Sequence, residues 1–194
     1  FVDYAHTEDA LRHVLRTVRE ITPGRLLLAF GCGGARDTDK RGKMGRAAAE
    51  LADHTLITSD NPRRESPAAI AAQIEAGYRA VRSDRFGVVL DRAQAIRQVL
   101  HLARAGDTVL IAGKGHEAYQ EFEDTVVPFD DRVHAQEARE ERGWRETQRA
   151  KAAETRARNA AEPSAGKPRR RRKMSRYPLS LARKPQPIPT YCLY

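Results

Sequence analysis

The feature that most constrains the fold is an alternation of short apolar runs with segments whose apolar residues recur at helical spacing. The run at 25–30 is continuous and apolar and ends at glycines, which is typical of a buried strand. Strands that alternate with helices favour an α/β fold, with a Rossmann-like, mostly parallel sheet and helices on both faces. The predicted strands are 1–3, 25–30, 54–58, 86–90 and 108–112.

The predicted helices begin at residues that commonly start helices. Thr7 and Asp91 can cap two of them, and Ser66 can cap a third that has Pro67 in its first position. Further elements are a helix at 44–52, a two-stranded ribbon at 119–122 and 125–127, and a last helix from near Val133. The apolar residues that we expect to be buried in the helix after Asp91 are Ile96, Val99, Leu100 and Leu102.

Four polar loops follow predicted strands, at 3–6, 31–37, 60–63 and 113–117. The carboxyl ends of parallel strands meet at one edge of a sheet, and open α/β sheets bind their ligands at that edge. No single loop makes the case for a site, because each could be an ordinary turn. Their expected convergence predicts a binding site.

The loop Asp60-Asn61-Pro62-Arg63 offers a carboxylate, an amide and a guanidinium close together. Arg63 could bind a carboxylate through two hydrogen bonds, and Asp60 could bind an amine. This set suits a ligand that carries both groups, such as an amino acid. The alternative is that Asp-Asn-Pro is simple turn chemistry.

The two glycine-rich loops let the backbone approach a ligand closely. The loop at 31–37 is not the dinucleotide fingerprint, and it lacks the Gly-x-x-x-x-Gly-Lys-Ser/Thr pattern of a P-loop. Cys32 fits a small buried residue better than a nucleophile. The loop at 113–117 places Lys114, His116 and Glu117 within five positions, although His116 alone would fit an ordinary hydrogen-bonded loop residue.

Charge divides the chain near residue 142. The formal charge is +9, yet the part up to Glu141 is mildly acidic and the basic residues concentrate beyond it. We therefore expect two regions: a folded domain at 1–141 and a basic, proline-rich, disordered tail at 142–194, in which 145–160 could extend a solvated helix. The basic run at 169–173 could contact phosphates, but no base-reading pattern accompanies it, so we expect no nucleic-acid partner.

The two cysteines, Cys32 and Cys192, lie far apart and show no metal or disulfide spacing, which fits a reducing cytoplasm. We expect no metal site in this chain. The apolar run Leu26–Phe30 is too short to span a membrane, and no membrane contact is expected. The sequence opens with Phe1 inside a predicted strand, so we expect further sequence upstream.

Taken together, the loops resemble the C-terminal domain of the Mur ligases, in particular the MurE type. The resemblance covers roughly residues 1–139, with motifs in order and at family-like spacing. It is carried by Val2-Asp3-Tyr4-Ala5-His6-Thr7, Phe30-Gly31-Cys32-Gly33-Gly34-Ala35-Arg36-Asp37, Met44-Gly45, Thr58-Ser59-Asp60-Asn61-Pro62-Arg63, Ala112-Gly113-Lys114-Gly115-His116-Glu117 and Pro128-Phe129-Asp130-Asp131-Arg132.

The resemblance implies an ATP- and Mg²⁺-dependent ligase of peptidoglycan synthesis. Such an enzyme activates the D-glutamate carboxylate of UDP-N-acetylmuramoyl-L-Ala-D-Glu as an acyl phosphate, and a diamino acid then attacks it. The Asp-Asn-Pro-Arg loop resembles the form that takes meso-diaminopimelate, whose distal carboxylate Arg36 and Arg63 could hold. The resemblance implies two residue sets: Arg36, Asp60, Asn61, Pro62, Arg63, Gly113 and Glu117 for diaminopimelate; and Asp3, Tyr4 and His6 near nucleotide and acyl phosphate, with His6 as the catalytic candidate.

Two departures stand in the loop before Met44: Ala35 replaces a common acidic residue and Gly42 a common proline. We expect them to loosen that loop. The larger departure is that the UDP-sugar-binding and ATPase domains are not in this sequence, so we expect the chain alone to be inactive. A separate chain that carries the ATPase domain could complete the enzyme. The alternatives are a non-catalytic amino-acid-binding module with a nucleic-acid-binding tail, a non-functional fragment, or another amide ligase of the superfamily such as a folylpolyglutamate synthase.

Overall fold

The structure is a computed structural model that describes residues 1–161, apart from the side chains of residues 145, 148 and 157–161. Contacts divide the chain into two units, Phe1–Ala153 and Glu154–Tyr194. The described part of the second unit is the end of one helix. The expectations for the basic run at 169–173, the proline-rich segment and Cys192 lie outside the described residues.

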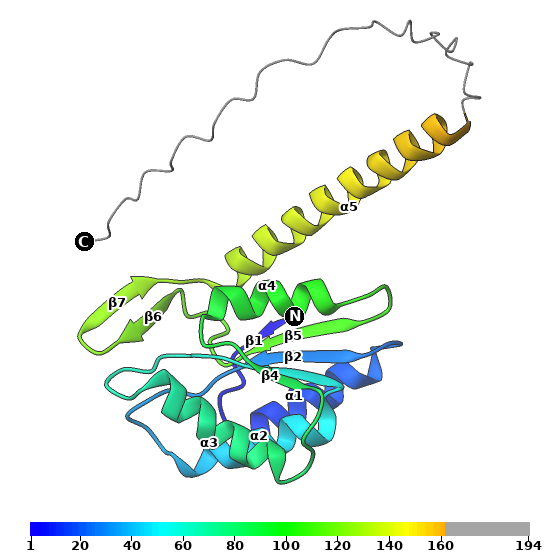
Figure 1. Cartoon of the computed structure of the whole chain (residues 1–194). Helices are drawn as coiled ribbons and strands as arrows, with labels where there is room; N and C mark the ends of the chain where they lie inside the picture. Colours follow the sequence, from blue (N-terminus) through cyan, green and yellow to red (C-terminus); the bar gives the residue numbers. More distant parts are fainter. Residues whose placement is uncertain (162–194) are drawn as a thin grey trace, which may run out of the picture. The chain divides into compact units, whose positions relative to one another are not determined.

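The first unit contains a five-stranded sheet in which every neighbouring pair is parallel (Figure 1). Its order is β1-β5-β2-β3-β4, so that β2 is central and fully buried. The predicted α/β fold is therefore confirmed. The strands are β1 (Val2–Asp3), β2 (Leu26–Phe30), β3 (His54–Ile57), β4 (Phe86–Val88) and β5 (Thr108–Ala112).

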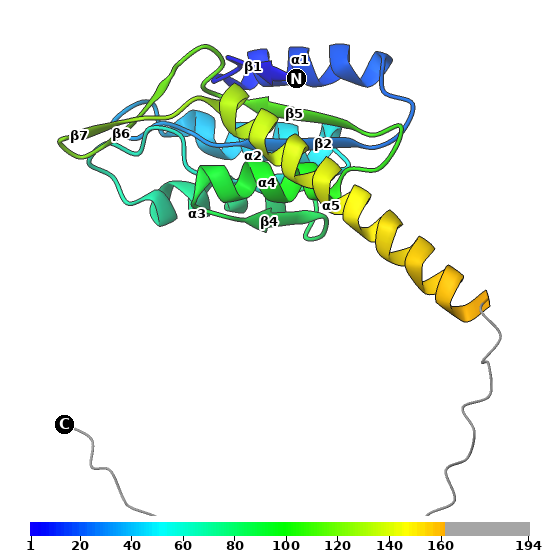
Figure 2. The same cartoon turned by 90° about the horizontal axis from the view of Figure 1, so that it is seen from above.

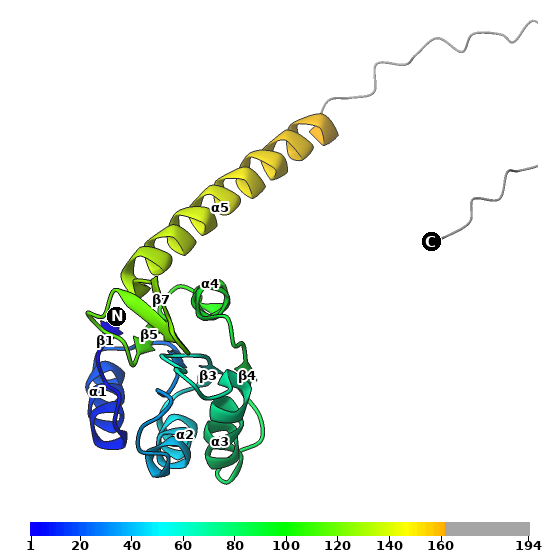
Figure 3. The same cartoon turned by 90° about the vertical axis from the view of Figure 1, so that its left-hand side faces the viewer.

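Helices cover both faces of the sheet. Figure 3 shows α1, α2 and α3 together on one face and α4 on the other. Alternate residues of β2 face opposite sides of the sheet. Leu28 packs in the larger core with α1 to α3, whereas Leu27 and Ala29 pack with Val99 of α4. The helices are α1 (Glu8–Glu20), α2 (Asp39–Leu51), α3 (Pro67–Arg79), α4 (Arg92–Leu102) and α5 (Asp131–Ala161).

An antiparallel ribbon, β6 (Tyr119–Phe122) and β7 (Thr125–Pro128), follows the sheet. In Figure 2 it extends from the side of the domain at which β5 ends. The loop after β3 joins it, because Arg63 forms an isolated bridge with Phe122. The ribbon therefore forms a wall beside the carboxyl edge of the sheet.

Several sequence expectations differ from the structure. Leu102 is exposed rather than buried, since α4 ends there, past the sheet. Helix α2 begins at Asp39, before the predicted start at residue 44. Helix α5 runs through the predicted boundary at 141/142 to Ala161, and it includes the segment 145–160 that was expected to extend a solvated helix. Within the described residues, no helix is both long and apolar enough to cross a membrane.

Helices α2 and α3 pack with their backbones in close contact. A Cβ built on Gly77 would lie 2.0 Å from the carbonyl oxygen of Gly42. Gly143 in α5 is the opposite case, since a Cβ there would meet nothing within 4 Å.

We therefore expect Gly77→Ala to lower the free energy of unfolding by about 1–3 kcal/mol, because α2 and α3 must move apart. Gly143→Ala is the matched control and should raise it by up to about 1 kcal/mol through helix propensity. Urea unfolding followed by circular dichroism measures both. Equal midpoints for the two variants would contradict this helix packing.

Candidate functional site

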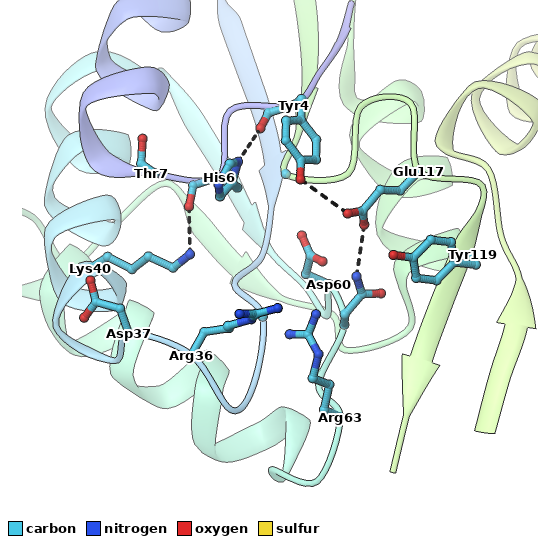
Figure 4. Close-up of a pocket in the computed structure, with 13 residues that line it drawn as sticks. Tyr4, His6, Thr7, Arg36, Asp37, Lys40, Asp60, Arg63, Glu117 and Tyr119 are labelled. Carbon is cyan, nitrogen blue, oxygen red and sulfur yellow. Dashed lines mark hydrogen bonds between the residues drawn. The ribbon is translucent and has the colours of Figure 1, made fainter. Parts of the chain in front are cut away.

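A polar cavity of about 440 Å³ lies at the carboxyl edge of the sheet (Figure 4). Its lining comes from the loops after β1, β2, β3 and β5, with further residues from α2 and the ribbon. All four loops predicted to converge contribute to it. The lining residues are Tyr4, His6, Thr7, Gly33, Arg36, Asp37, Lys40, Asp60, Asn61, Arg63, Gly113, Glu117 and Tyr119.

Two of the predicted site residues, Asp3 and Pro62, do not line the cavity. The Asp3 carboxylate accepts a hydrogen bond from the backbone N–H of Ala5 at 2.8 Å and so shapes the turn after β1. Pro62 packs against the glycine-rich loop, where a Cβ on Gly34 would lie 1.9 Å from the Pro62 carbonyl oxygen. Both residues therefore shape loops.

Five lining residues were not predicted: Thr7, Gly33, Asp37, Lys40 and Tyr119. Lys40 lies in the first turn of α2, which begins earlier than the sequence suggested, and its Nζ donates to the carbonyl of His6 at 2.9 Å. Tyr119 belongs to β6, whose position beside the site has no local sequence signal. The early start of α2 has one weak signal, the Asp37-Thr38-Asp39 segment, which is typical of a helix start.

Arg63 is held at the mouth of the cavity by its neighbours. Its Nε donates to Glu121 at 2.8 Å and its Nη1 to the carbonyl of Gly34 at 2.8 Å. The residue has a φ of 53°, a left-handed conformation that is costly for arginine and is held by backbone bonds to the ribbon. The side chain is thus fixed before any ligand arrives.

Arg36 differs from Arg63, since within the described residues its guanidinium has no hydrogen bond or ion pair. Figure 4 shows it extending into the cavity towards Arg63. The backbone beside it is anchored: Glu65 accepts a hydrogen bond from the Ala35 N–H and binds Arg41. Arg41 is fully buried and also donates to the Gly33 carbonyl at 3.1 Å. The loop around Ala35 is therefore held by hydrogen bonds between its backbone and the side chains of Glu65 and Arg41.

The opposite wall carries acidic and amide groups. Asn61 Nδ2 donates to Glu117 Oε2 at 3.0 Å, and Lys114 lies beneath both residues. Asp60 is buried, and this desolvation raises the pKa of its carboxyl group, against the opposing effects of Arg92 and Lys114. Gly113 permits this packing, because it has a φ of 114° and a Cβ there would lie 2.6 Å from Asp60 Oδ2.

Aromatic rings form the third side. The ring of Tyr4 lies 4.6 Å from that of His6 and 5.0 Å from that of His116, and its hydroxyl faces Glu117 at 3.5 Å. His6 Nδ1 lies 3.0 Å from the Tyr4 carbonyl, which makes Nδ1 the protonated nitrogen and leaves Nε2 as an acceptor. Nε2 is therefore the ring nitrogen of His6 that remains for a ligand.

The loop after β2 also carries Cys32, which is buried. Burial raises the pKa of the Cys32 thiol to about 12, so this residue is unreactive and packs against Met44. In the part of the chain that the structure describes, no group of three or more His, Cys, Asp or Glu residues could hold a metal ion.

The fold and cavity define a parallel α/β domain with a polar small-molecule site, and comparison with known proteins identifies its family. The family model described as "Mur ligase, glutamate ligase domain" matches residues 1–115. The chain therefore belongs to the Mur ligase family through this domain.

Two curated relatives and one solved structure share the name UDP-N-acetylmuramoyl-L-alanyl-D-glutamate--2,6-diaminopimelate ligase. The protein from Syntrophomonas wolfei is 53% identical over 136 residues, which is 70% of this chain and 28% of that protein. The one from Gloeobacter violaceus is 54% identical over 137 residues, or 71% of this chain and 28% of its own length. A solved structure of a ligase with this name shares 44% identity, with a TM-score of 0.69 over 73% of this chain and 29% of its own. The chain thus spans about 28% of the length of these curated relatives.

Proposed function

We propose that this chain supplies the amino-acid-binding domain of a ligase that joins meso-diaminopimelate to UDP-N-acetylmuramoyl-L-Ala-D-Glu in the cytoplasm. The observation that carries the proposal is the polarity of the cavity. Arg36 and Arg63 present guanidinium groups from one side, and Asp60 and Glu117 present carboxylates from the other. The names of the relatives agree with this chemistry.

The cavity suits a ligand with charged groups at both ends. Its volume of about 440 Å³ is within the usual range for small-molecule sites. Arginine pairs with carboxylates in a bidentate manner, while Asp60 and Glu117 match an ammonium. L-lysine lacks the distal carboxylate that meso-diaminopimelate carries, so it would leave a guanidinium without its partner. A site built for a polar group rejects an analogue without that group.

The described residues do not form a complete site for ATP and Mg²⁺. The sequence has no P-loop pattern, and the described residues offer no metal cluster. We therefore assign amino-acid binding to this chain and no phosphoryl-transfer step. Tyr4 and His6 line the cavity, and from the resemblance we assign them to the side that faces nucleotide and acyl phosphate. UDP-N-acetylmuramoyl dipeptide and nucleotide would be bound by the other domains of the complete ligase, or by a separate ATPase-domain chain.

Heteronuclear NMR titration of the chain with meso-diaminopimelate tests the proposal. We expect saturable shifts in the backbone signals of the loops at 31–37, 60–63 and 113–117, and at least about tenfold weaker binding of L-lysine. Absence of shifts with either ligand, or equal affinities for both, would reject the proposal. The same preparation should not turn over ATP when UDP-N-acetylmuramoyl dipeptide is added.

A further inference from the structure

Lys114 is a fully buried lysine directly beneath the cavity, although it does not line it. It lies between two glycines whose backbones are in the left-handed region, Gly113 at a φ of 114° and Gly115 at 54°. A Cβ on Gly115 would also lie 2.7–2.8 Å from atoms of Tyr4. The loop after β5 is therefore shaped so that its lysine turns inward rather than towards solvent.

The ammonium of Lys114 contacts Asn61, Glu117 and Asp60, the three residues that we call the amide wall. Its Nζ donates to Asn61 Oδ1 at 2.9 Å and to Glu117 Oε2 at 3.3 Å, and it lies 4.0 Å from Asp60 Oδ1. The Tyr119 ring covers it at 5.3 Å. An ammonium has three donors and no acceptor, so every neighbouring polar atom must present an acceptor to it.

This requirement fixes the orientation of the Asn61 amide. Its Oδ1 accepts from both Lys114 and the backbone N–H of Glu121, at 2.9 and 3.1 Å. Its Nδ2 donates one hydrogen to Glu117, which leaves the second for a ligand. A flipped amide would direct its N–H groups at the ammonium. Asn61 can therefore only donate to a bound ligand.

The same contacts orient Glu117. Its Oε2 accepts from Lys114 and Asn61, whereas among the described residues its Oε1 has only the Tyr4 hydroxyl, at 3.5 Å. That second oxygen, together with the carboxylate of Asp60, remains to accept hydrogen bonds from a ligand. The Lys114 ammonium thus leaves the amide wall with one hydrogen-bond donor for a ligand, from Asn61, and two acceptors, from Glu117 and Asp60.

We propose that Lys114 is a positioning residue that sets this donor and acceptor pattern. One end of the ligand, which carries both a carboxylate and an ammonium, then binds with its carboxylate at Asn61 and its ammonium at Glu117 and Asp60. The inference rests on the proposed function, because it concerns the same ligand. It adds a residue that acts through its neighbours and does not touch the ligand itself.

The first test replaces the cation while keeping the length of the side chain. Lys114→Met should weaken binding of meso-diaminopimelate by about 10- to 100-fold in the NMR titration, since a charge-assisted hydrogen bond holding Asn61 is lost. Lys114→Gln keeps a neutral donor for Asn61 Oδ1 and should lose less. Lys43→Met, at an exposed lysine of α2, is the matched control and should bind like the parent.

The second readout is one that a purely structural role would not change. Asp60 binds an ammonium only when ionised, so affinity is full above its pKa and is lost as the pH falls through it. Burial raises that pKa; Arg92 and Lys114 oppose the rise, while Glu117 and Asp131 add to it. Removing Lys114 should therefore move the midpoint of the pH dependence upward. The side-chain amide signal of Asn61, assigned by its loss in Asn61→Asp, should also shift in Lys114→Met before any ligand is added.

The outcomes separate the two proposals. If the parent chain does not bind meso-diaminopimelate, the proposed function fails. If the parent binds and folded Lys114→Met binds within twofold of it with the same pH midpoint, the role of Lys114 is overturned. If neither Lys114→Met nor Lys114→Gln folds, Lys114 is needed for the fold and the positioning role is rejected as well.

Discussion

Replacing Arg92 with methionine is expected to lower the free energy of unfolding by about 3–5 kcal/mol. Arg92 is the first residue of α4 and is almost fully buried. Its guanidinium binds both oxygens of the buried Asp131 at 2.7 Å, and it donates to the carbonyls of Ser59 and Ala112 at 3.1 Å. Methionine would leave a buried carboxylate and two buried carbonyls without this partner.

The position of those carbonyls links this pair to the site. Ser59 directly precedes Asp60, and Ala112 directly precedes Gly113, so that one guanidinium joins the two loops that carry the amide wall. We therefore expect Arg92→Met to weaken ligand binding even at temperatures where the variant is folded. At about 2–4 °C per kcal/mol, the melting temperature should fall by about 6–20 °C.

Arg97→Met is the matched control on the same helix. Arg97 is half-buried and its Nε lies 3.9 Å from Glu141, a long contact that contributes little, so the free energy of unfolding should change by less than about 0.5 kcal/mol. The double variant Arg92→Met with Asp131→Leu should recover part of the loss, because it removes the unpaired carboxylate. Urea unfolding followed by circular dichroism distinguishes these cases. An Arg92→Met midpoint equal to that of Arg97→Met would rule out the bridge as a source of stability.

The ion pair between Arg92 and Asp131 could not be predicted from the sequence. Alternation of apolar runs was enough to predict the parallel sheet, and strand ends were enough to place the four loops at one edge. Both follow from local patterns, since periodicity and chain direction determine them. Arg92 and Asp131 are 39 residues apart, and each belongs to a helix start at which polar residues are ordinary. No local pattern marks them as partners.

The same limit applies to Lys114 and Leu102. A lysine between glycines reads as a solvent-exposed loop residue, and only the positive φ values on both sides turn it inward. Leu102 has the spacing of a buried position, yet α4 ends at that residue and leaves it exposed. In both cases the deciding factor is where a backbone segment ends or bends relative to others, which the spacing of residue types does not specify.

Arg36→Met is expected to weaken binding of meso-diaminopimelate by about 10- to 100-fold while leaving the stability of the fold unchanged. The guanidinium of Arg36 extends into the cavity, and within the described residues it has no partner to lose (Figure 4). Its loss should therefore appear only in binding. Arg63→Met should reduce both binding and stability, because that side chain also ties Glu121 to Gly34.

The ligand series identifies the group that Arg36 recognises. Affinity for L-lysine, which lacks the distal carboxylate, should change less than about twofold in Arg36→Met, so that the preference for meso-diaminopimelate over lysine falls with the variant. Arg64→Met, at an exposed neighbour paired with Asp124, is the control and should keep the parent preference. If Arg36→Met weakened both ligands equally, Arg36 would contact a group that they share. The distal carboxylate would then depend on Arg63 alone, whose Nε and Nη1 are already engaged, and selection against lysine would have to come from outside this cavity.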